Sequence, residues 1–292
     1  MRELLTTFGI GLVSGVLSGA FGIGGGIITT PAIRLLLGAP PLIAVGTPLP
    51  VIFPSAVTGL LNYRRQGLLE TRTGVWCGAI GSVFAVLGAL ATRYVGGSVV
   101  LLATAALILY TAGDMLLQVL QVKAAPSLGL EAGEERDAFA SAPDEEAGRA
   151  RGLPESSCLV RATPEADLPA LWKLALAGTL AGAYSGFLGL GGGFVLVPVL
   201  SRWFGYDIKR AIGTSLLAIA ILAVPGTITH ALLGHIDWRI AVVLIFGVVP
   251  GAWLGSRVTL GATDRVIRIS FAVLLVVVGA WLAAAELGWL PR

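Results

Sequence analysis

The chain has 292 residues, of which 55% are hydrophobic and only 13% are charged, and its mean hydropathy is +0.86. A soluble globular domain carries about 25% charged residues, so this composition excludes an ordinary soluble domain and favours an all-α integral membrane protein. The net charge of +3 is unevenly distributed, because residues 122–170 hold ten acidic and five basic side chains, which leaves fifteen bases against seven acids elsewhere. We therefore expect a multi-pass protein of the cytoplasmic (cell) membrane.

Eight segments are long and apolar enough to cross a bilayer, which takes about 20 residues. In chain order they are 4–25, 42–62, 74–95, 98–120, 172–192, 211–233, 239–258 and 266–287. Two more apolar stretches, 26–38 and 193–204, are too short to cross alone. Residues 122–170 are rich in Ala, Glu, Pro, Gly and Ser, a composition typical of a disordered linker. The sequence thus predicts two membrane units, 1–121 and 171–292, joined by a polar linker over 122–170.

The two membrane units repeat each other at a constant offset of 167 residues. The matching pairs include Gly15/Gly182, Ser18/Ser185, Gly22/Gly189, Gly24/Gly191, Gly25/Gly192, Gly26/Gly193, Pro31/Pro198, Gly46/Gly213, Thr47/Thr214 and Gly59/Gly226. Chance coincidence among apolar residues would not align glycine, proline and threonine together. The pattern predicts about eight transmembrane helices from two homologous four-helix repeats.

The number of crossings decides how the two repeats are oriented. Eight simple spans make the repeats parallel, with Arg64, Arg65 and Arg72 on one side of the membrane and Lys209, Arg210, Arg265 and Arg268 on the other. A re-entrant glycine segment would instead insert them in opposite directions. We expect eight spans.

Each repeat interrupts its first apolar segment with a glycine cluster, FGIGGG at 21–26 and LGLGGG at 188–193. The preceding glycines at spacing four form a seam for close helix packing; these are Gly11, Gly15, Gly19, Gly178, Gly182 and Gly186. Three consecutive glycines each cost about 1 kcal/mol inside a helix, and Pro31 suits the first turn of a new helix. The first helix of each repeat is therefore predicted to break near Gly22 and Gly189, with plain packing as the alternative.

An unwound backbone at membrane depth is tolerated where protein buries it or where it lines a wet cavity. Its free N–H groups, and the positive end of the following half-helix, suit a small anion. This hypothesis gives as anion ligands Gly22, Gly24, Gly25, Gly26, Gly189, Gly191, Gly192 and Gly193. The clusters do not fit a nucleotide, because Ile27 stands where the last glycine of G-x-G-x-x-G belongs and no Gly-Lys-Ser/Thr follows.

The duplicated FGIGGG…P and LGLGGG…P, each followed by a Gly-Thr pair at Gly46-Thr47 and Gly213-Thr214, resemble the TauE/SafE family of membrane proteins, the sulfite-exporter or DUF81 family. The resemblance covers nearly all of both halves, whereas the linker has no counterpart in the family. It implies a secondary transporter of small sulfur-containing anions such as sulfite, sulfoacetate or other organosulfonates. By motif, it also adds Thr47 and Thr214 to the candidate site.

Several polar side chains inside the apolar segments are candidates for chemistry. The hydroxyls of Thr47, Thr214 and the adjacent Ser215 would donate to an oxyanion, or bond back to their own helix. His230 is a candidate for proton coupling near neutral pH, with an interfacial role as the alternative. Asp114 is a candidate proton relay, or else a snorkelled or hydrogen-bonded acid near a helix end.

No catalytic constellation accompanies these residues. The chain has only two histidines, no Gly-x-Ser-x-Gly elbow and no pair of carboxylates in its apolar parts. Its two cysteines, Cys77 and Cys158, give neither a disulfide framework nor a metal spacing. We expect no enzymatic activity, no metal, no cofactor and no nucleic acid, and as partners a small anionic substrate and the lipid bilayer. Two alternatives remain: an anion channel of the same fold, and a membrane anchor whose linker recruits a soluble protein.

Overall fold

The computed structural model describes residues 2–95, 97–124 and 171–286, and the regular structure in these ranges is entirely α-helical. The helices before the linker are α1 (Arg2–Phe21), α2 (Gly26–Leu36), α3 (Pro41–Gly46), α4 (Pro48–Arg65), α5 (Thr71–Ala91) and α6 (Gly97–Ala124). Those after it are α8 (Leu171–Leu188), α9 (Gly193–Trp203), α10 (Ile208–Leu232), α11 (Trp238–Gly261) and α12 (Asp264–Glu286). The predicted linker lies almost entirely outside the described residues.

Within the described residues, six helical segments are long and apolar enough to cross a membrane: α1, α3 and α4 together, α5, α10, α11 and α12. The prediction of an all-α membrane protein is therefore confirmed, but eight spanning helices are not. The two short apolar stretches form α2 and α9, each of 11 residues. At 1.5 Å per residue such a helix is about 16 Å long, well short of the roughly 30 Å hydrocarbon core.

The short helices fold back along the helices that precede them. Ser14 of α1 donates a hydrogen bond to the carbonyl of Gly25, just before α2. Further along, Ile10 of α1 shares a buried apolar cluster with Ala32 and Ile33 of α2. The second half repeats this arrangement, since Gly192 lies against Ala181 of α8. Each glycine cluster is thus the tip of a helical hairpin, not the middle of a straight span.

This reversal changes the relation between the two halves. A Cβ added to Gly59 of α4 would lie 3.0 Å from Leu216 of α10, and one added to Gly226 would lie 3.7 Å from Leu49. The residue numbers of these contacts decrease along α4 as they increase along α10, so the two helices are antiparallel. They nevertheless occupy equivalent positions at the offset of 167. Antiparallel helices replace the parallel ones that eight simple spans require, because each hairpin returns the chain to the end from which it came.

The predicted glycine seams join the two halves. Gly11, Gly15 and Gly19 of α1 lie directly against the backbone of Leu244, Val248 and Ala252 of α11. In the same way, Gly178, Gly182 and Gly186 of α8 lie against the backbone of Cys77, Gly81 and Ala85 of α5. The first helix of each hairpin therefore packs in parallel on a helix of the other half, at a distance that a side chain would prevent.

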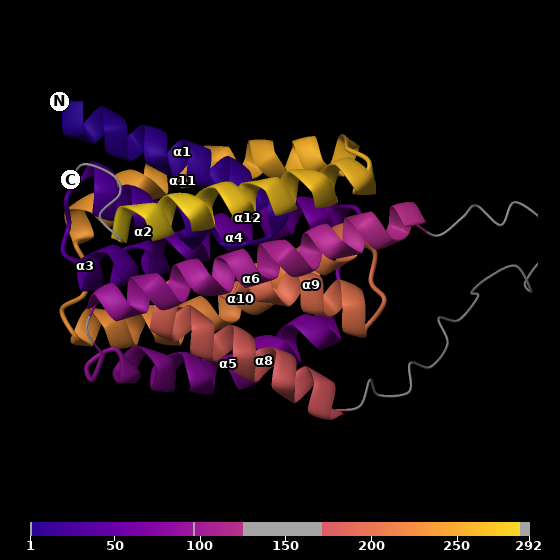
Figure 1. Ribbon diagram of the computed structural model, residues 1–292, viewed down its shortest axis with the longest axis horizontal. Helices are drawn as coiled ribbons and strands as arrows, with labels where there is room; N and C mark the ends of the chain where they lie inside the picture. Colours follow the sequence, from indigo (N-terminus) through magenta and orange to yellow (C-terminus); the bar gives the residue numbers. More distant parts are fainter. Residues whose placement is uncertain (1, 96, 125–170, 287–292) are drawn as a thin grey trace, which may run out of the picture.

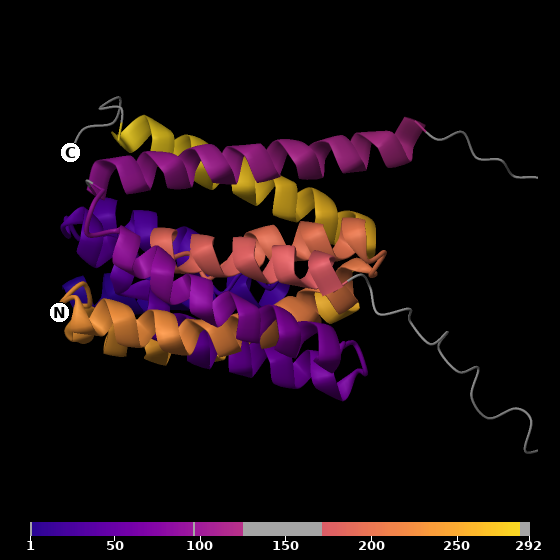
Figure 2. The same cartoon turned by 90° about the horizontal axis from the view of Figure 1, so that it is seen from below.

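The bundle has two ends and one outer layer (Figures 1 and 2). Helices α1 and α3 begin and α12 ends at what we call the terminal end, which carries the loops 37–40, 92–95 and 233–237. Helix α6 ends and α8 begins at the opposite, linker end, which carries the loops 66–70, 204–207 and 262–263. Helices α6 and α12 pack on each other and cover one face of the remaining helices.

Candidate anion-binding site

The two glycine clusters break their helices as the sequence predicts. Helix α1 ends at Phe21 and α2 begins at Gly26, while α8 ends at Leu188 and α9 begins at Gly193. In the first break Gly22, Gly24 and Gly25 have φ of 68°, 77° and 81°, and in the second Gly189, Gly191 and Gly192 have 68°, 84° and 71°. Residues with a Cβ rarely adopt this left-handed region. Pro31 is the sixth residue of α2 and not in its first turn, because the helix resumes directly after Gly25.

The two breaks pack on each other in the middle of the bundle. A Cβ added to Gly26 would lie 2.7 Å from the Cα of Leu190, and one added to Gly193 would meet the carbonyl oxygen of Gly22. Residues 21–27 and 188–198 are buried throughout. The equivalent side chains of Ile52 and Ile219 close around Gly24, 3.0 and 3.2 Å from the place where its Cβ would be. The breaks thus form one buried region shared by both halves.

The backbone amides of the two breaks are short of partners. In the first break Gly22 donates to Ser18, and donation resumes with Ile28 and Thr29, which both bond to the Gly25 carbonyl. In the second, Gly189 donates to Ser185 and donation resumes with Val195 and Leu196. The amides of residues 23–27 and 190–194 have no acceptor within the part of the chain that the structure describes. A buried amide without a partner costs about 1–3 kcal/mol, so these groups favour an anionic acceptor.

Hydroxyl groups donate to two carbonyls of the first break, those of Gly22 and Gly25. Ser14 and Thr29 both donate to the Gly25 carbonyl, at 2.8 and 3.0 Å. Ser215, which the sequence proposes as an anion ligand, reaches the same break from α10 and donates to the Gly22 carbonyl at 3.0 Å. It also donates to Ile212 one turn earlier. Of the three predicted hydroxyl ligands, the structure therefore brings only Ser215 to a break.

The second break lacks these hydroxyls. The positions equivalent to Ser14, Thr29 and Ser215 hold Ala181, Leu196 and Pro48. Ser18 in the first half accepts a hydrogen bond from Ser55 at 2.6 Å. The position equivalent to Ser55 holds Leu222, and the buried Oγ of Ser185 has no hydrogen-bond partner in the described structure. Ser185 is one turn beyond Ala181, on the α8 face that packs against Gly192. The sequence pairs Ser185 with Ser18 in the repeat but does not single it out as a ligand.

The hydroxyls of Thr47 and Thr214 contact loops at opposite ends of the bundle, whereas their neighbours Val45 and Ser215 lie against the breaks. Thr47 accepts a hydrogen bond from the amide of Asp237 at the terminal end, and Thr214 accepts one from the amide of Glu70 at the linker end, both at 3.1 Å. The neighbouring Gly46 and Gly213 lie against the carbonyls of His235 and Leu68. Each Gly-Thr pair thus clamps a loop of the other half, and we call these contacts the terminal clamp and the linker clamp.

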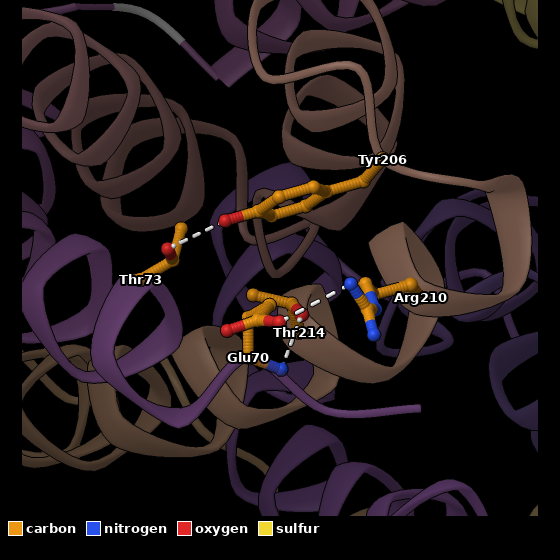
Figure 3. A network of polar contacts seen from close by, with 5 residues as sticks. All are labelled: Glu70, Thr73, Tyr206, Arg210 and Thr214. Atoms are coloured by element: carbon orange, nitrogen blue, oxygen red, sulfur yellow. Dashed lines mark hydrogen bonds and ion pairs between the residues drawn. The ribbon is translucent and has the colours of Figure 1, made fainter. Parts of the chain in front are cut away.

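The linker clamp carries an additional polar network (Figure 3). Arg210 of α10 forms an ion pair with Glu70 at 3.3 Å, and the hydroxyls of Thr73 and Tyr206 are 2.9 Å apart. Burial raises the pKa of Tyr206 above its ordinary value, so the phenol stays neutral. At the terminal end the equivalents of Arg210, Thr73 and Tyr206 are Ile43, Ile240 and Ala39, which cannot form such a network.

Both histidines lie together near the terminal clamp. Buried His230 bonds through Nε2 to the carbonyl of Gly186 at 2.8 Å, and its Nδ1 is 3.3 Å from Nδ1 of His235. Tyr63, the equivalent of His230, donates to the Gly19 carbonyl at 3.2 Å. Each side chain therefore anchors the helix that leads into a break. The side chain of Asp114, the other candidate for proton coupling, lies outside the described residues; its backbone belongs to α6.

A cavity of about 440 Å³ lies away from the breaks, between α6, α8 and α9. Its polar lining comes from Tyr110, Thr111, Tyr184 and Arg202. Val195, three residues after Gly192, also lines it. The breaks themselves are closed over by packed backbone and isoleucine side chains.

Comparison with known proteins agrees with this membrane architecture. The family model described as sulfite exporter TauE/SafE matches residues 7–282. The chain belongs to the TauE/SafE family. A probable membrane transporter protein of Xylella fastidiosa (strain 9a5c) is 27% identical over 96% of this chain and 95% of its own length. The probable membrane transporter protein YunE of Bacillus subtilis is 23% identical over 94% of both chains. No solved structure matches the chain.

Membership of the TauE/SafE family establishes the general class of the protein. The similar proteins are named membrane transporters, not enzymes, and the apolar helices of the chain are those of a multi-pass membrane protein. The chain is accordingly a membrane transporter of the TauE/SafE type, with a small-molecule substrate and the lipid bilayer as its surroundings.

Proposed function

We propose that the chain is a secondary transporter that carries small sulfur-containing anions, such as sulfite, sulfoacetate or other organosulfonates, across the cytoplasmic membrane. The anion binds between the two halves, at the termini of the broken helices. The observation that carries this proposal is the pair of breaks, whose buried amides at 23–27 and 190–194 have no acceptor among the described residues. The name of the family, sulfite exporter, supports the choice of anion.

The two halves act as inverted repeats of a common four-helix plan. Equivalent residues make equivalent contacts across the molecule, as in Thr47 with Asp237 and Thr214 with Glu70. The antiparallel course of α4 and α10 relates the two sets by a twofold axis in the membrane plane. Such repeats place a binding region at the interface of two broken helices, with half-helix N-termini directed at an anionic group.

Access to the site requires the breaks to separate. Gly26 and Gly193 lie so close to the opposite break that no ion fits between them in the closed arrangement. The two Gly-Thr clamps hold the closed state at opposite ends, so opening one while the other stays shut exposes the site to one side at a time. Thr47 and Thr214 thereby serve as gates, in place of the ligand role expected from the sequence.

Ser185 supplies a side-chain donor to the bound anion. Its buried hydroxyl has no partner among the described residues, and it lies on the face of α8 that packs on the second break. Around the first break, Ser14, Thr29 and Ser215 already donate to carbonyls. The second break, with its amides and Ser185, therefore binds the anion more strongly than the first.

His230 and His235 couple a proton to the movement. A buried imidazole that bonds to the Gly186 carbonyl changes that bond when it gains a proton, and Gly186 leads directly into the second break. The close contact of the two rings lets one proton be shared between them. Asp114 is retained as a second candidate for the relay on its sequence position alone.

The experiment that tests the proposal is uptake of labelled sulfite, sulfate, thiosulfate and a sulfonate into liposomes that contain the purified protein. A carrier gives saturable flux and exchange of one anion for another, whereas conductance far above carrier turnover indicates a channel. Deletion of residues 125–165 leaves the flux of a carrier intact but disables an anchor that recruits a partner. Absence of flux for all four anions, in protein that inserts and folds, would refute the proposed cargo.

A further inference from the structure

The two ends of the bundle differ strongly in charge. Among the described side chains, ten basic ones lie at the linker end and three at the terminal end. The linker-end bases are Arg64, Arg65, Arg72, Lys173, Arg202, Lys209, Arg210, Arg257, Arg265 and Arg268; those at the terminal end are Arg34, Arg93 and Arg239. The described acids do not offset this difference, because Glu70, Asp207 and Asp264 lie at the linker end and Glu3 and Asp237 at the terminal end.

Direct contacts unite the linker-end bases on one surface. Arg210 pairs with Glu70 of the loop 66–70. Lys209 donates to the carbonyl of Leu260 at 3.0 Å, and Arg268 donates to Ser201 at 3.2 Å. Three loop regions, 66–70 of the first half and 204–207 and 262–263 of the second, therefore meet at the same end. The expectation that Lys209, Arg210, Arg265 and Arg268 lie opposite Arg64, Arg65 and Arg72 is wrong, because it counted each hairpin as a crossing.

Most of these bases remain open to the surroundings. Arg64, Arg65, Arg72, Arg202, Arg257 and Arg265 are exposed. Lysine and arginine in short loops and near the ends of spanning helices are enriched on the cytoplasmic side of membrane proteins. The anionic headgroups of the cytoplasmic leaflet attract such a surface.

We propose that the linker end faces the cytoplasm, where its basic surface contacts anionic lipid headgroups, and that both ends of the chain lie on the outer side of the membrane. The segment between Ala124 and Leu171 then begins and ends in the cytoplasm. The Glu70–Arg210 network becomes the inner gate, and the loop that carries His235 becomes part of the outer gate. This assignment goes beyond the proposed cargo and does not depend on it.

Cysteine labelling tests the orientation with a natural reporter. Cys158 belongs to the segment between α6 and α8, whereas Cys77 is buried, with 1% of its surface exposed. A membrane-impermeant maleimide should label the wild-type protein in inside-out vesicles and lose that labelling in right-side-out vesicles. The matched variant Cys158→Ser should not be labelled in either, which assigns the signal to one residue.

Two introduced cysteines extend the test to both ends of the bundle. In the Cys158→Ser background, Gln66→Cys at the linker end should behave as Cys158 does, and Tyr94→Cys, which is 90% exposed at the terminal end in the native protein, should show the opposite pattern. A C-terminal alkaline phosphatase fusion should be active, and a C-terminal green fluorescent protein fusion should be dark. Labelling of Cys158 or Gln66→Cys from outside, or a fluorescent C-terminal fusion, would overturn the assignment whether or not the protein transports sulfite.

Discussion

The two glycine breaks, one in each half of the molecule, have similar backbone conformations and different polar side chains around them. Both turn through three left-handed glycines into an 11-residue helix. Around the first break, Ser14, Thr29 and Ser215 donate to the exposed carbonyls, whereas the second break has Ser185 without a partner in the described structure. Glycine geometry is thus common to both breaks, whereas the arrangement of the hydroxyls differs; in the proposed function this difference makes the first break a scaffold and the second a donor site.

The largest loss of transport is expected from substitution of the glycines, and it should be the same at the first break and at the second. Leucine at Gly25 or Gly192 must adopt φ near 81° or 71°, and its Cβ would lie 2.7 Å from Ser14 Oγ or 2.5 Å from the Ala181 carbonyl. Gly25→Leu and Gly192→Leu should each abolish anion flux in liposomes. Gly9→Ala is the matched control, because its Cβ meets nothing within 4 Å. Normal flux from both leucine variants, in properly inserted protein, would remove the binding role of the breaks.

The next largest effect should come from substitution of the equivalent residues Ser18 and Ser185, which should differ in their effect on the KM for the anion. Hydrogen bonds to charged groups contribute about 1.5–3 kcal/mol, so Ser185→Ala should raise the KM for the anion about tenfold or more. Ser18→Ala breaks the bond to Ser55 and should lower the melting temperature with little change in KM. Equal KM values for the two variants would contradict the assignment of Ser185 as a ligand.

The two clamps should respond unequally to loss of their threonine. Thr47→Val leaves the amide of Asp237 without its acceptor, and Thr214→Val does the same to Glu70, at a cost of about 1 kcal/mol each. The linker clamp keeps the Glu70–Arg210 and Thr73–Tyr206 contacts. The accessibility of a cysteine introduced at the terminal end should therefore increase more on Thr47→Val than the accessibility of one introduced at the linker end increases on Thr214→Val. The reverse order would show that the polar network does not hold its gate.

The smallest expected effect is the dependence of the melting temperature on pH, which should arise from His235 in the second half. Burial, and then the charge of Arg93, lower the pKa of His235. The unfolded chain therefore binds the proton more tightly than the folded protein does. As a result, the folded protein loses stability as the pH falls below about 6.5. Arg93→Gln should raise the pKa and lessen the loss of melting temperature between about pH 7 and 5. Arg239→Gln, another exposed base at this end, should leave the profile unchanged; an identical shift in both would argue against a specific Arg93 effect.

The sequence predicts the breaks well, because three adjacent glycines and a following proline have few alternatives in a helix. The offset of 167 residues gives a prediction of which residues occupy equivalent places. Hydropathy does not reveal that α2 and α9 turn back, since an apolar segment of 11 residues reads the same in either direction. That single ambiguity explains why the parallel halves and the sidedness of Lys209 and Arg210 were wrong.

The sequence indicates less about the roles of individual hydroxyls than about the breaks. A Gly-Thr pair beside a glycine cluster suggests one shared site, but Thr47 and Thr214 reach loops at opposite ends only because α4 and α10 run antiparallel. Tyr63 and His230 are aligned by the repeat, yet their common task of bonding to a carbonyl of a broken helix depends on packing between distant segments. Ser185 differs from Ser18 through Leu222, a position whose partner the sequence does not indicate.

The seam between α1 and α11 has a consequence for biosynthesis. Gly11, Gly15 and Gly19 pack against residues that are translated more than two hundred positions later, so the first hairpin emerges long before its partner exists. Contacts of such sequence separation form late and slowly. The first hairpin must wait, shielded by lipid or by the insertion machinery, until α11 arrives, and only then does the amino-terminal half reach its final form.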